Sequence, residues 1–174
     1  MVSRGGAEIR RERHRLFFRG KQTLDVFLLL NLSAITVSLR EKGLNLMDIN
    51  SLTEKIIGAA ITVHKELGPG LLESVYQTCL FDELESLNVK ARKEVALPVM
   101  YRNRIVSEDG FRLDLLVEDA VIIELKSVER IQPVHAKQLL TYLRLANKPL
   151  GLLINFNESM LKDGITRISN GFGL

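Results

Sequence analysis

The chain has 174 residues, of which 46% are hydrophobic, so it is long enough to bury one good core and a single folded domain is expected. Its one cysteine, Cys79, excludes an intramolecular disulfide and a cysteine metal cluster, and fits a reducing compartment. Residues 1–46 hold nine Lys or Arg against four Asp or Glu, a net charge of +5; residues 47–174 hold fifteen against seventeen, a net charge of −2. Nucleic-acid binding by the second part therefore needs a local basic patch or a bound metal, because its overall field is not positive.

The N-terminal segment differs in character from the rest. An Arg-rich stretch over residues 4–21 precedes an interrupted apolar run over residues 26–39, which is too short to span a membrane comfortably. The two together imitate an export signal, but the basic part is long and no Ala-x-Ala-like cleavage site follows. We expect residues 1–46 to be an extension outside the core, or translation from a start upstream of Met47. The folded domain is then residues 47–174, in a cytoplasmic protein without membrane association.

The first helical pattern follows this segment. Ser51 and Glu54 have the spacing of a capping box, and apolar residues then repeat with a helical period. The pattern predicts a helix over residues 52–67, ended by the Gly-Pro-Gly sequence at residues 68–70. His64 lies on the apolar side of this helix, where a single histidine is more often a packing residue with a satisfied hydrogen bond than a functional one.

A second helix is predicted from residue 71 or 72 to Asn88. One side of it is apolar and consists of Leu72, Val75, Tyr76, Cys79, Leu80, Leu84 and Leu87. Glu73 lies in the first turn, where the helix dipole favours an acid for structural reasons alone. It also follows Leu72 on the inward side, after a glycine that permits close approach of the backbone, so its side chain has a second possible direction, toward the sheet.

Alternating side chains predict a long strand over residues 89–101, in which a proline is typical of an edge or a bulge. A turn follows, Ile105 begins a return strand, and residues 108–110 bend the chain into the next hairpin. Arg102 and Arg104 at the turn are either phosphate contacts or the ordinary solvated charges of a hairpin tip.

The centre of the chain places charged residues into apolar strands. Two apolar runs, residues 113–117 and 121–125, flank a polar break with the pattern of a hairpin loop. With a three-residue loop, Asp114 lies directly opposite Glu124 across the antiparallel pair, and the period of two puts Lys126 on the same face as Glu124. Two carboxylates and an ammonium group are therefore expected to converge.

Such a cluster on an apolar sheet requires compensation, because unpaired buried charge costs several kcal/mol and facing carboxylates repel. A divalent cation is one solution, and ligands that are all oxygen favour a hard ion such as Mg²⁺, which also bridges to phosphate. The alternative is that Asp114 and Glu124 form ion pairs with Arg112, Lys126 or other basic side chains on a solvated edge.

The last third of the chain returns to helix and strand. A proline in its first turn supports a helix over residues 134–146, on which Gln138 and Tyr142 share a face. The continuous apolar run at residues 150–156 predicts a strand that is buried on both faces. A short final element is expected through Ile168.

The order of these elements resembles the PD-(D/E)XK nuclease superfamily: a helix, a three-stranded meander, a helix and a strand, with Asp114 on the second strand and a Glu-x-Lys motif on the third. Gly70-Leu-Leu-Glu73 and Gln138-Leu-Leu-Thr-Tyr142 resemble the flanking Gly-x-x-Glu and Gln-x-x-x-Tyr motifs of its RecB-like branch. The resemblance implies an α/β fold with a restriction-endonuclease-like core, in which helices flank a mixed central sheet of about four to five strands.

Two stretches, Leu-Gly-Pro-Gly-Leu-Leu-Glu-Ser-Val-Tyr and Gly-Leu-Leu-Ile-Asn-Phe, also resemble the small bacterial family called GxxExxR proteins, over about residues 48–170. Two positions depart from these patterns. Tyr76 stands where the family name calls for arginine, and Leu113 stands where the superfamily name calls for proline before Asp114.

The resemblance also implies roles for particular residues. The implied catalytic residues are Glu73, Asp114, Glu124, Lys126, Gln138 and Tyr142. The implied ligands of a catalytic Mg²⁺ (or Mn²⁺) are Asp114, Glu124, the carbonyl oxygen of Leu125, and Glu73, which completes the acidic site. Lys126 positions the attacking water and offsets developing phosphate charge, while Gln138 and Tyr142 orient Lys126 or the substrate.

Three functions follow as hypotheses. The first is metal-dependent hydrolysis of phosphodiester bonds in DNA. The second is a binding or regulatory module that keeps the nuclease fold without efficient turnover, which the acidic balance of residues 47–174 favours. The third is hydrolysis of another substrate with the carboxylates as acid and base, for which no substrate pocket pattern is present. The oligomeric state is not specified by the sequence.

Overall fold

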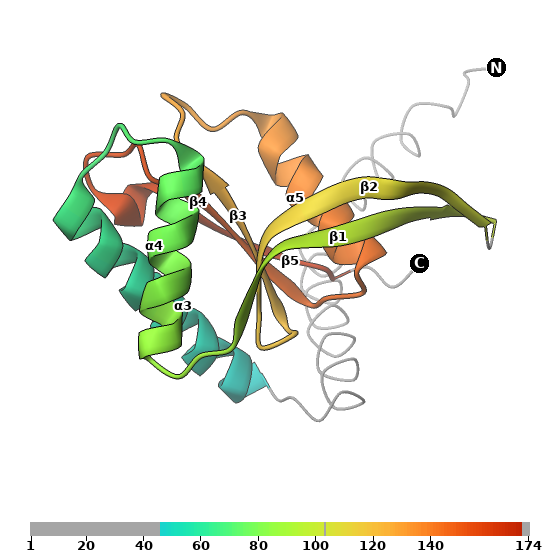
Figure 1. Ribbon diagram of the computed structural model, residues 1–174, viewed down its shortest axis with the longest axis horizontal. Coiled ribbons are helices and arrows are strands. Elements are labelled where there is room, and N and C mark those ends of the chain that lie inside the picture. The colour runs from blue at the N-terminus through green and yellow to red at the C-terminus, as the bar shows by residue number, and fades with distance from the viewer. Residues whose placement is uncertain (1–45, 103, 172–174) are drawn as a thin grey trace, which may run out of the picture.

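The computed structural model describes residues 46–102 and 104–171, which form one layered α/β domain (Figure 1). Its helices are α3 (Leu46–Leu67), α4 (Glu73–Ser86) and α5 (Pro133–Leu145), with a short 3₁₀ helix, η1 (Leu161–Gly164). Its strands are β1 (Ala91–Tyr101), β2 (Arg104–Val117), β3 (Val121–Lys126), β4 (Leu150–Asn155) and β5 (Ile165–Ser169).

The strands form one five-stranded sheet in the order β1-β2-β3-β4-β5. Neighbouring strands are antiparallel except for β3 and β4, which are parallel. A parallel pair needs a crossover connection, and α5 provides it. This mixed sheet with flanking helices confirms the expected α/β fold and the number of strands.

Helices cover both faces of the sheet, which explains the unbroken apolar sequence of its centre. On one face α3 and α4 pack through Ile56, Ala60, Tyr76 and Leu80 against Leu115, Ile123, Leu125 and Leu152. On the other face α5 packs through Leu139 and Leu143 against Leu113, Ile122 and Leu153. Every residue of β4 is buried, as predicted for a strand covered on both sides.

Helix α3 begins more than one turn before its predicted start, so the expected capping box was wrong. Ser51 is an exposed residue inside the helix, and the chain is already helical from Leu46. The earlier turn adds Ile49, 3% exposed, to the core, and the Thr53 hydroxyl donates a hydrogen bond to the carbonyl oxygen of Ile49 at 3.0 Å. Burial of one more apolar side chain outweighs the local capping pattern.

Three other predictions about the helices have different outcomes. Leu72 is 74% exposed and precedes α4 in extended conformation, so it does not belong to the apolar side that was expected to include it. His64 is the expected packing residue, since it is buried beside the Phe156 ring and its Nε2 lies 2.8 Å from the carbonyl oxygen of Glu158. The predicted helix over residues 134–146 is confirmed as α5.

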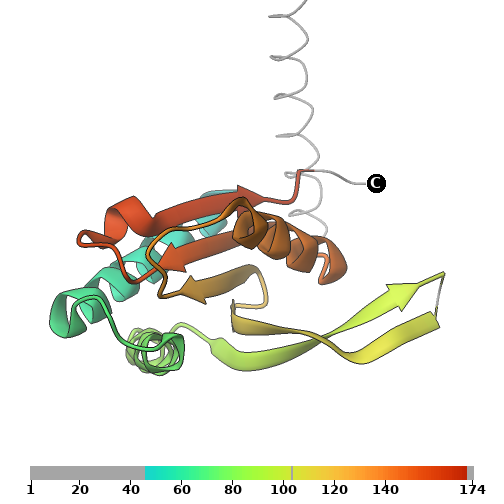
Figure 2. The same cartoon turned by 90° about the horizontal axis from the view of Figure 1, so that it is seen from above.

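β1 and β2 continue past the rest of the sheet as a two-stranded ribbon (Figures 1 and 2). β3 pairs with β2 only at residues 115–117, so the outer part of β2 has no neighbour on that edge. The predicted bend at residues 108–110 is a bulge inside β2, where the register shifts between Leu97 and Val99. A Cβ atom on Gly110 would clash with the carbonyl oxygen of Leu97, so glycine allows the two strands to approach here.

Residues 1–45 lie outside the described part of the chain, so the division at residue 46 stays a prediction. Among the described helices, none combines the length and the apolar character that crossing a membrane requires.

Candidate active site

The candidate site lies where β2 and β3 separate. Their pairing ends at Leu115 and Ile123, and the next residue on each strand is Asp114 and Glu124, as the hairpin pattern predicted. Beyond this point Asp114 no longer follows the strand ladder, and its Oδ2 accepts a hydrogen bond from the backbone N–H of Leu125 at 2.7 Å. The opened strands therefore present both carboxylates at one end of the hairpin.

Glu124 is 3% exposed and forms a close ion pair with Lys126. Lys126 Nζ lies 2.8 Å from Glu124 Oε1 and donates a second hydrogen bond to the carbonyl oxygen of Leu125 at 2.9 Å. The other carboxylate oxygen, Glu124 Oε2, is buried without a hydrogen-bond partner. Because an unsatisfied buried oxygen is costly, it marks a place where the fold alone does not complete the site.

Burial and the neighbouring charges shift the pKa values of the side chains in this cluster. Burial raises the pKa of the Glu124 carboxyl to about 7, and the negative charge of Asp114 adds to the rise while Lys126 opposes it. Burial likewise raises the pKa of Asp114, against the hydrogen bond from Leu125 and the charge of Lys126. Burial alone would lower the pKa of Lys126, but its hydrogen bond to Glu124 and the surrounding acids outweigh that effect and raise it.

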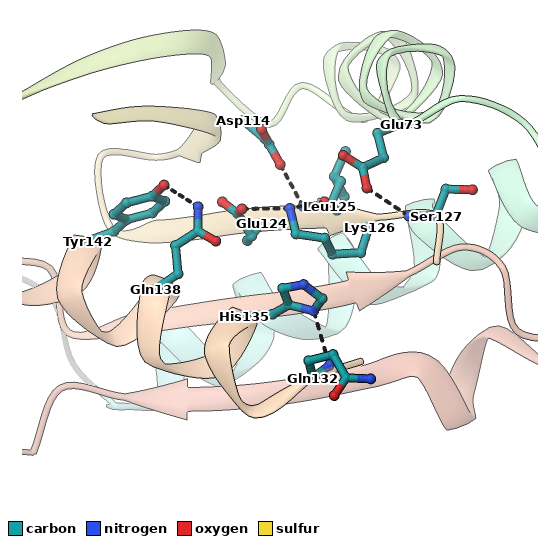
Figure 3. Close-up of polar contacts among 10 residues, drawn as sticks. All are labelled: Glu73, Asp114, Glu124, Leu125, Lys126, Ser127, Gln132, His135, Gln138 and Tyr142. Carbon is teal, nitrogen blue, oxygen red and sulfur yellow. Dashed lines mark hydrogen bonds and ion pairs between the residues drawn. The ribbon is translucent and has the colours of Figure 1, made fainter. Parts of the chain in front are cut away.

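Glu73 reaches the cluster from the first turn of α4. Its Oε1 accepts a hydrogen bond from the backbone N–H of Ser127 at 3.1 Å, so its side chain does point toward the sheet (Figure 3). Tyr76 supports this approach, because its hydroxyl donates to the carbonyl oxygen of Gly68 at 2.7 Å and accepts from the N–H of Leu71 at 3.1 Å. Tyr76 thus holds the turn that leads into Glu73.

Gln138 and Tyr142 lie on α5 and border the cluster from the other side of β3 (Figure 3). Within the described chain, Gln138 Nε2 donates its hydrogen bond to the Tyr142 hydroxyl and not to Lys126. Burial raises the pKa of Tyr142, and the charges of Glu124 and Asp114 contribute to the rise. The Tyr142 ring also contacts Phe111 of β2, with ring centres 5.1 Å apart. All six residues predicted for the site are therefore brought to one end of the sheet.

The structure adds Gln77 and Glu94, which the sequence did not single out. Gln77 lies one turn after Glu73, and its Nε2 donates to the backbone oxygen of Asp114 at 3.1 Å and to Glu94 Oε1 at 2.5 Å. Glu94 lies opposite Asp114, because the residues on either side of it in β1 pair with the residues on either side of Asp114. Its backbone is left-handed, with a φ of 53°. An open cavity of about 530 Å³ is lined by Glu73, Gln77, Glu94, Asp114, Leu125 and Ser127, among others.

His135 shares one face of α5 with Gln138 and Tyr142, because the three residues are spaced i, i+3 and i+7. Its Nδ1 accepts a hydrogen bond from the backbone N–H of Gln132 at 3.2 Å, so in the neutral ring the proton is on Nε2 (Figure 3). The helical spacing was visible in the sequence; the fixed tautomer was not.

The family model of the PD-(D/E)XK nuclease superfamily matches residues 50–168, which is more than half of the chain and contains every residue of the site. The chain belongs to this superfamily. No curated protein and no solved structure matches it. Members of the PD-(D/E)XK superfamily are generally phosphodiesterase nucleases that use divalent metal ions, so membership indicates a nuclease-like function on nucleic acid.

The donor atoms of this PD-(D/E)XK site suit a hard cation. Glu124 Oε2 is buried and unpartnered, the Asp114 carboxylate lies beside it, and the carbonyl oxygen of Leu125 already accepts from a cationic group. No group of three His, Cys, Asp or Glu side chains in residues 46–102 and 104–171 is placed to form a complete metal cage. Mg²⁺ does not need one, because it usually keeps several waters and takes one or two carboxylates from the protein.

Proposed function

We propose that the protein is a metal-dependent nuclease that hydrolyses phosphodiester bonds in DNA. The observation that carries the proposal is the buried, unpartnered Glu124 Oε2 beside Asp114 and Lys126 at the open end of the β2–β3 hairpin. Clustered carboxylates with shifted pKa values in a cleft are typical of functional sites. We also infer that the chain belongs to the RecB-like branch and to the GxxExxR proteins, and that it works in the cytoplasm.

The proposed ligands of the metal are Asp114, Glu124 and the carbonyl oxygen of Leu125, with Glu73 completing the acidic site. Mg²⁺ is the proposed ion, with Mn²⁺ as its substitute, since the donors are all oxygen. Such an ion supplies a water of lowered pKa and neutralises charge on the phosphoryl oxygens. Gln77 and Glu94 hold the backbone of Asp114 in place, because Gln77 bonds to both.

Lys126 has two roles in this proposal. Its ammonium group contacts Glu124 Oε1 and the carbonyl oxygen of Leu125, which are two of the proposed ligand atoms. The lysine therefore neutralises the site in the absence of metal, and a cation that binds there competes with it for these oxygens. With a metal held by these residues, the same ammonium group would be available to a phosphate oxygen or an attacking water. Gln138 and Tyr142 border the cluster from α5 (Figure 3).

A binding or regulatory module with slow turnover is the second candidate. It is favoured by the net charge of −2 in residues 47–174 and by the Glu124–Lys126 ion pair, which already compensates one carboxylate. In this case the alternative predicted from the sequence, an ion pair in place of a metal, describes the working state of the protein.

The test incubates the purified full chain with single-stranded, duplex and branched DNA in Mg²⁺, in Mn²⁺ and in EDTA. We expect cleavage in the two metal buffers and none in EDTA. Binding of DNA without cleavage in any buffer would support the module, and the absence of both would overturn the proposal. A control with Lys55→Gln, an exposed lysine on α3, should behave like the unaltered protein.

A further inference from the structure

We propose that the tip of the β1–β2 ribbon is a docking element for double-stranded DNA. The ribbon tip consists of Met100, Tyr101, Arg102, Arg104, Ile105 and Val106. The inference deepens the proposed function and rests on it, since it takes DNA as the substrate and concerns how the duplex is held beyond the catalytic site.

The ribbon tip is exposed although four of its six side chains are apolar. Met100 is 51% exposed, Tyr101 58%, and Ile105 and Val106 are each 55% exposed. The last pair of the ribbon that is anchored to the body is Leu97 with Phe111, where Leu97 packs into the core beneath α5 and Phe111 contacts the Tyr142 ring. Beyond this pair the ribbon projects from the domain in both views (Figures 1 and 2). Exposed apolar side chains gathered on a projecting element indicate a surface that is covered by a partner.

The charges of the ribbon indicate the chemistry of that partner. Closer to the body, the basic side chains have acids to pair with: Arg92 contacts Asp119 at 3.1 Å and Arg112 contacts Glu94 at 3.6 Å. Among the side chains that the structure describes, which do not include that of Asp109, none forms an ion pair with Arg102 or Arg104. The Arg102 guanidinium lies over the Tyr101 ring, 5.2 Å from its centre. No acid occurs from Met100 to Ser107 in the sequence. The tip therefore offers two positive charges to an anionic surface, in a domain that is otherwise slightly acidic.

The shape of the element fits a duplex groove. The major groove of B-DNA is wide enough to admit a two-stranded β-ribbon, with arginines reaching the phosphates on its walls. Apolar side chains such as Met and Ile also serve as wedges against base steps. A ribbon that is bulged twice and carries a close approach at Gly110 has the strong twist that follows a groove.

The distance from the site to the tip is shorter than one turn of DNA. Asp114 lies opposite Glu94, and Arg104 pairs with Tyr101, so β1 covers this interval in seven residues while the bulged β2 uses ten. At about 3.3 Å per residue of β1 the two positions are about 23 Å apart. Neighbouring base pairs are about 3.4 Å apart along the helix axis, so a duplex whose scissile phosphate lies at Asp114 would meet the tip about seven base pairs away.

A second copy of the chain is the other occupant that an apolar ribbon can attract, through its unpaired edges. A contact between two ribbon tips would bring four arginines together with no acid among them, which is unfavourable. The charge of the tip thus favours the nucleic acid.

The test compares Arg102→Gln/Arg104→Gln with a matched control, Lys55→Gln/Lys90→Gln, which removes two positive charges from exposed sites away from the tip. Each full-length protein is titrated in Mg²⁺ against a duplex of about 30 base pairs, roughly three helical turns, whose phosphorothioate linkages resist cleavage. Binding is measured by fluorescence anisotropy at several salt concentrations. Loss of two phosphate contacts should make the slope of log K against log salt shallower by about 1.8 in the tip variant, and the control should keep the slope of the unaltered protein.

Three results would count against the proposal, each in a different way. Equal slopes for the unaltered protein and the tip variant, when both bind, would overturn the docking role and leave the nuclease proposal intact. Absence of duplex binding by the unaltered protein would overturn the docking role together with duplex DNA as the substrate, and would leave single-stranded and branched DNA to the cleavage test. A dimer in sedimentation that becomes a monomer in the tip variant would assign the ribbon tip to self-association. Melting curves of all three proteins should coincide, because the exchanged side chains are exposed.

Discussion

β2 passes through two environments within its fourteen residues. Its inner end lies between β1 and β3 and is covered by helices on both faces, so that Leu113, Leu115 and Val117 are 1% exposed or less. Its outer end pairs with β1 alone, and Ile105 and Val106 are 55% exposed. The local pattern of the sequence is similar at both ends. The same strand thus carries a core segment and an interaction segment, and only its neighbours distinguish them.

Because the inner end of β2 is buried and the outer end is exposed, a charged side chain has a different effect at each end. At the inner end, burial raises the pKa of Asp114 and of Glu124, so a carboxylate there requires a lysine or a cation. At the outer end, Arg102 and Arg104 remain hydrated at little cost, and their placement says more about a partner than about stability. Five variants test this contrast, and they are given from the largest expected effect to the smallest.

Leu113→Ala tests the core character of the inner end. Leu113 is 1% exposed and packs in the cluster beneath α5, so its truncation should lower the free energy of unfolding by about 2–5 kcal/mol. Because the chain has no tryptophan, urea unfolding is best followed by circular dichroism. A loss below about 1 kcal/mol would mean that the inner end is not held as a core strand.

Lys126→Ala tests the catalytic assignment. We expect cleavage to fall by about 10²–10³-fold, comparable to the loss of one charged or hydrogen-bonding group that stabilises a transition state. Calorimetry should still detect Mg²⁺ or Mn²⁺, because the lysine supplies no ligand oxygen and competes with the ion for Glu124 and the Leu125 carbonyl. Full activity in this variant would discredit the assignment, and abolished metal binding would give Lys126 a structural role.

Glu124→Gln tests the electrostatic strain of the metal-free site. A carboxyl whose folded-state pKa of about 7 lies above its ordinary value of 4.5 binds its proton more tightly in the folded state. Its contribution to stability is therefore greatest below pH 4.5 and is lost as the pH rises to 7, by up to about 3 kcal/mol. In EDTA, the difference in unfolding free energy between wild type and variant should change with pH across this window. A difference that is independent of pH would show that Glu124 titrates normally.

Asp114→Asn tests whether repulsion or an ion pair dominates at the hairpin end. Asparagine keeps the shape and the acceptor for the Leu125 N–H but removes a charge that faces Glu124, Glu73 and Glu94. The metal-free variant should be more stable by about 1 kcal/mol, and it should lose most of the extra stability that Mg²⁺ or Mn²⁺ gives the wild type. Arg112 and Lys126 pair with Glu94 and Glu124, so neither cation is left without its partner. A destabilised variant that is indifferent to metal would sink the proposed metal site.

Ile105→Ser with Val106→Ser tests the outer end and is the control for Leu113→Ala on the same strand. Both side chains are 55% exposed, so the change in unfolding free energy should stay within about 0.5 kcal/mol for each substitution. A loss of several kcal/mol would show that the ribbon tip packs against another part of the protein, which would remove the basis for a docking surface.

Much of the fold and part of the site were predictable from the sequence, because they depend on local patterns. Continuous apolar runs predicted the buried strands β3 and β4, a proline in the first turn predicted α5, and the three-residue break set the register that puts Asp114 level with Glu124. The spacing of Gln138 and Tyr142 put them on one helix face. In each case the period of a strand or helix determines which side chains share a face, without reference to the rest of the chain.

Other features were decided only by contacts between distant segments. The start of α3 depends on the burial of Ile49 in a core that local capping rules do not include. Glu94 enters the site because it has a left-handed backbone conformation in β1 opposite Asp114. Gln77 of α4 donates hydrogen bonds to both Glu94 and Asp114. The contact of Lys126 with the Leu125 carbonyl and the orphaned oxygen of Glu124 arise because β2 and β3 separate beneath α4 and α5. Periodicity determined which residues face the same way, and packing in three dimensions determined which of them meet, because burial and pairing depend on neighbours far away in the chain.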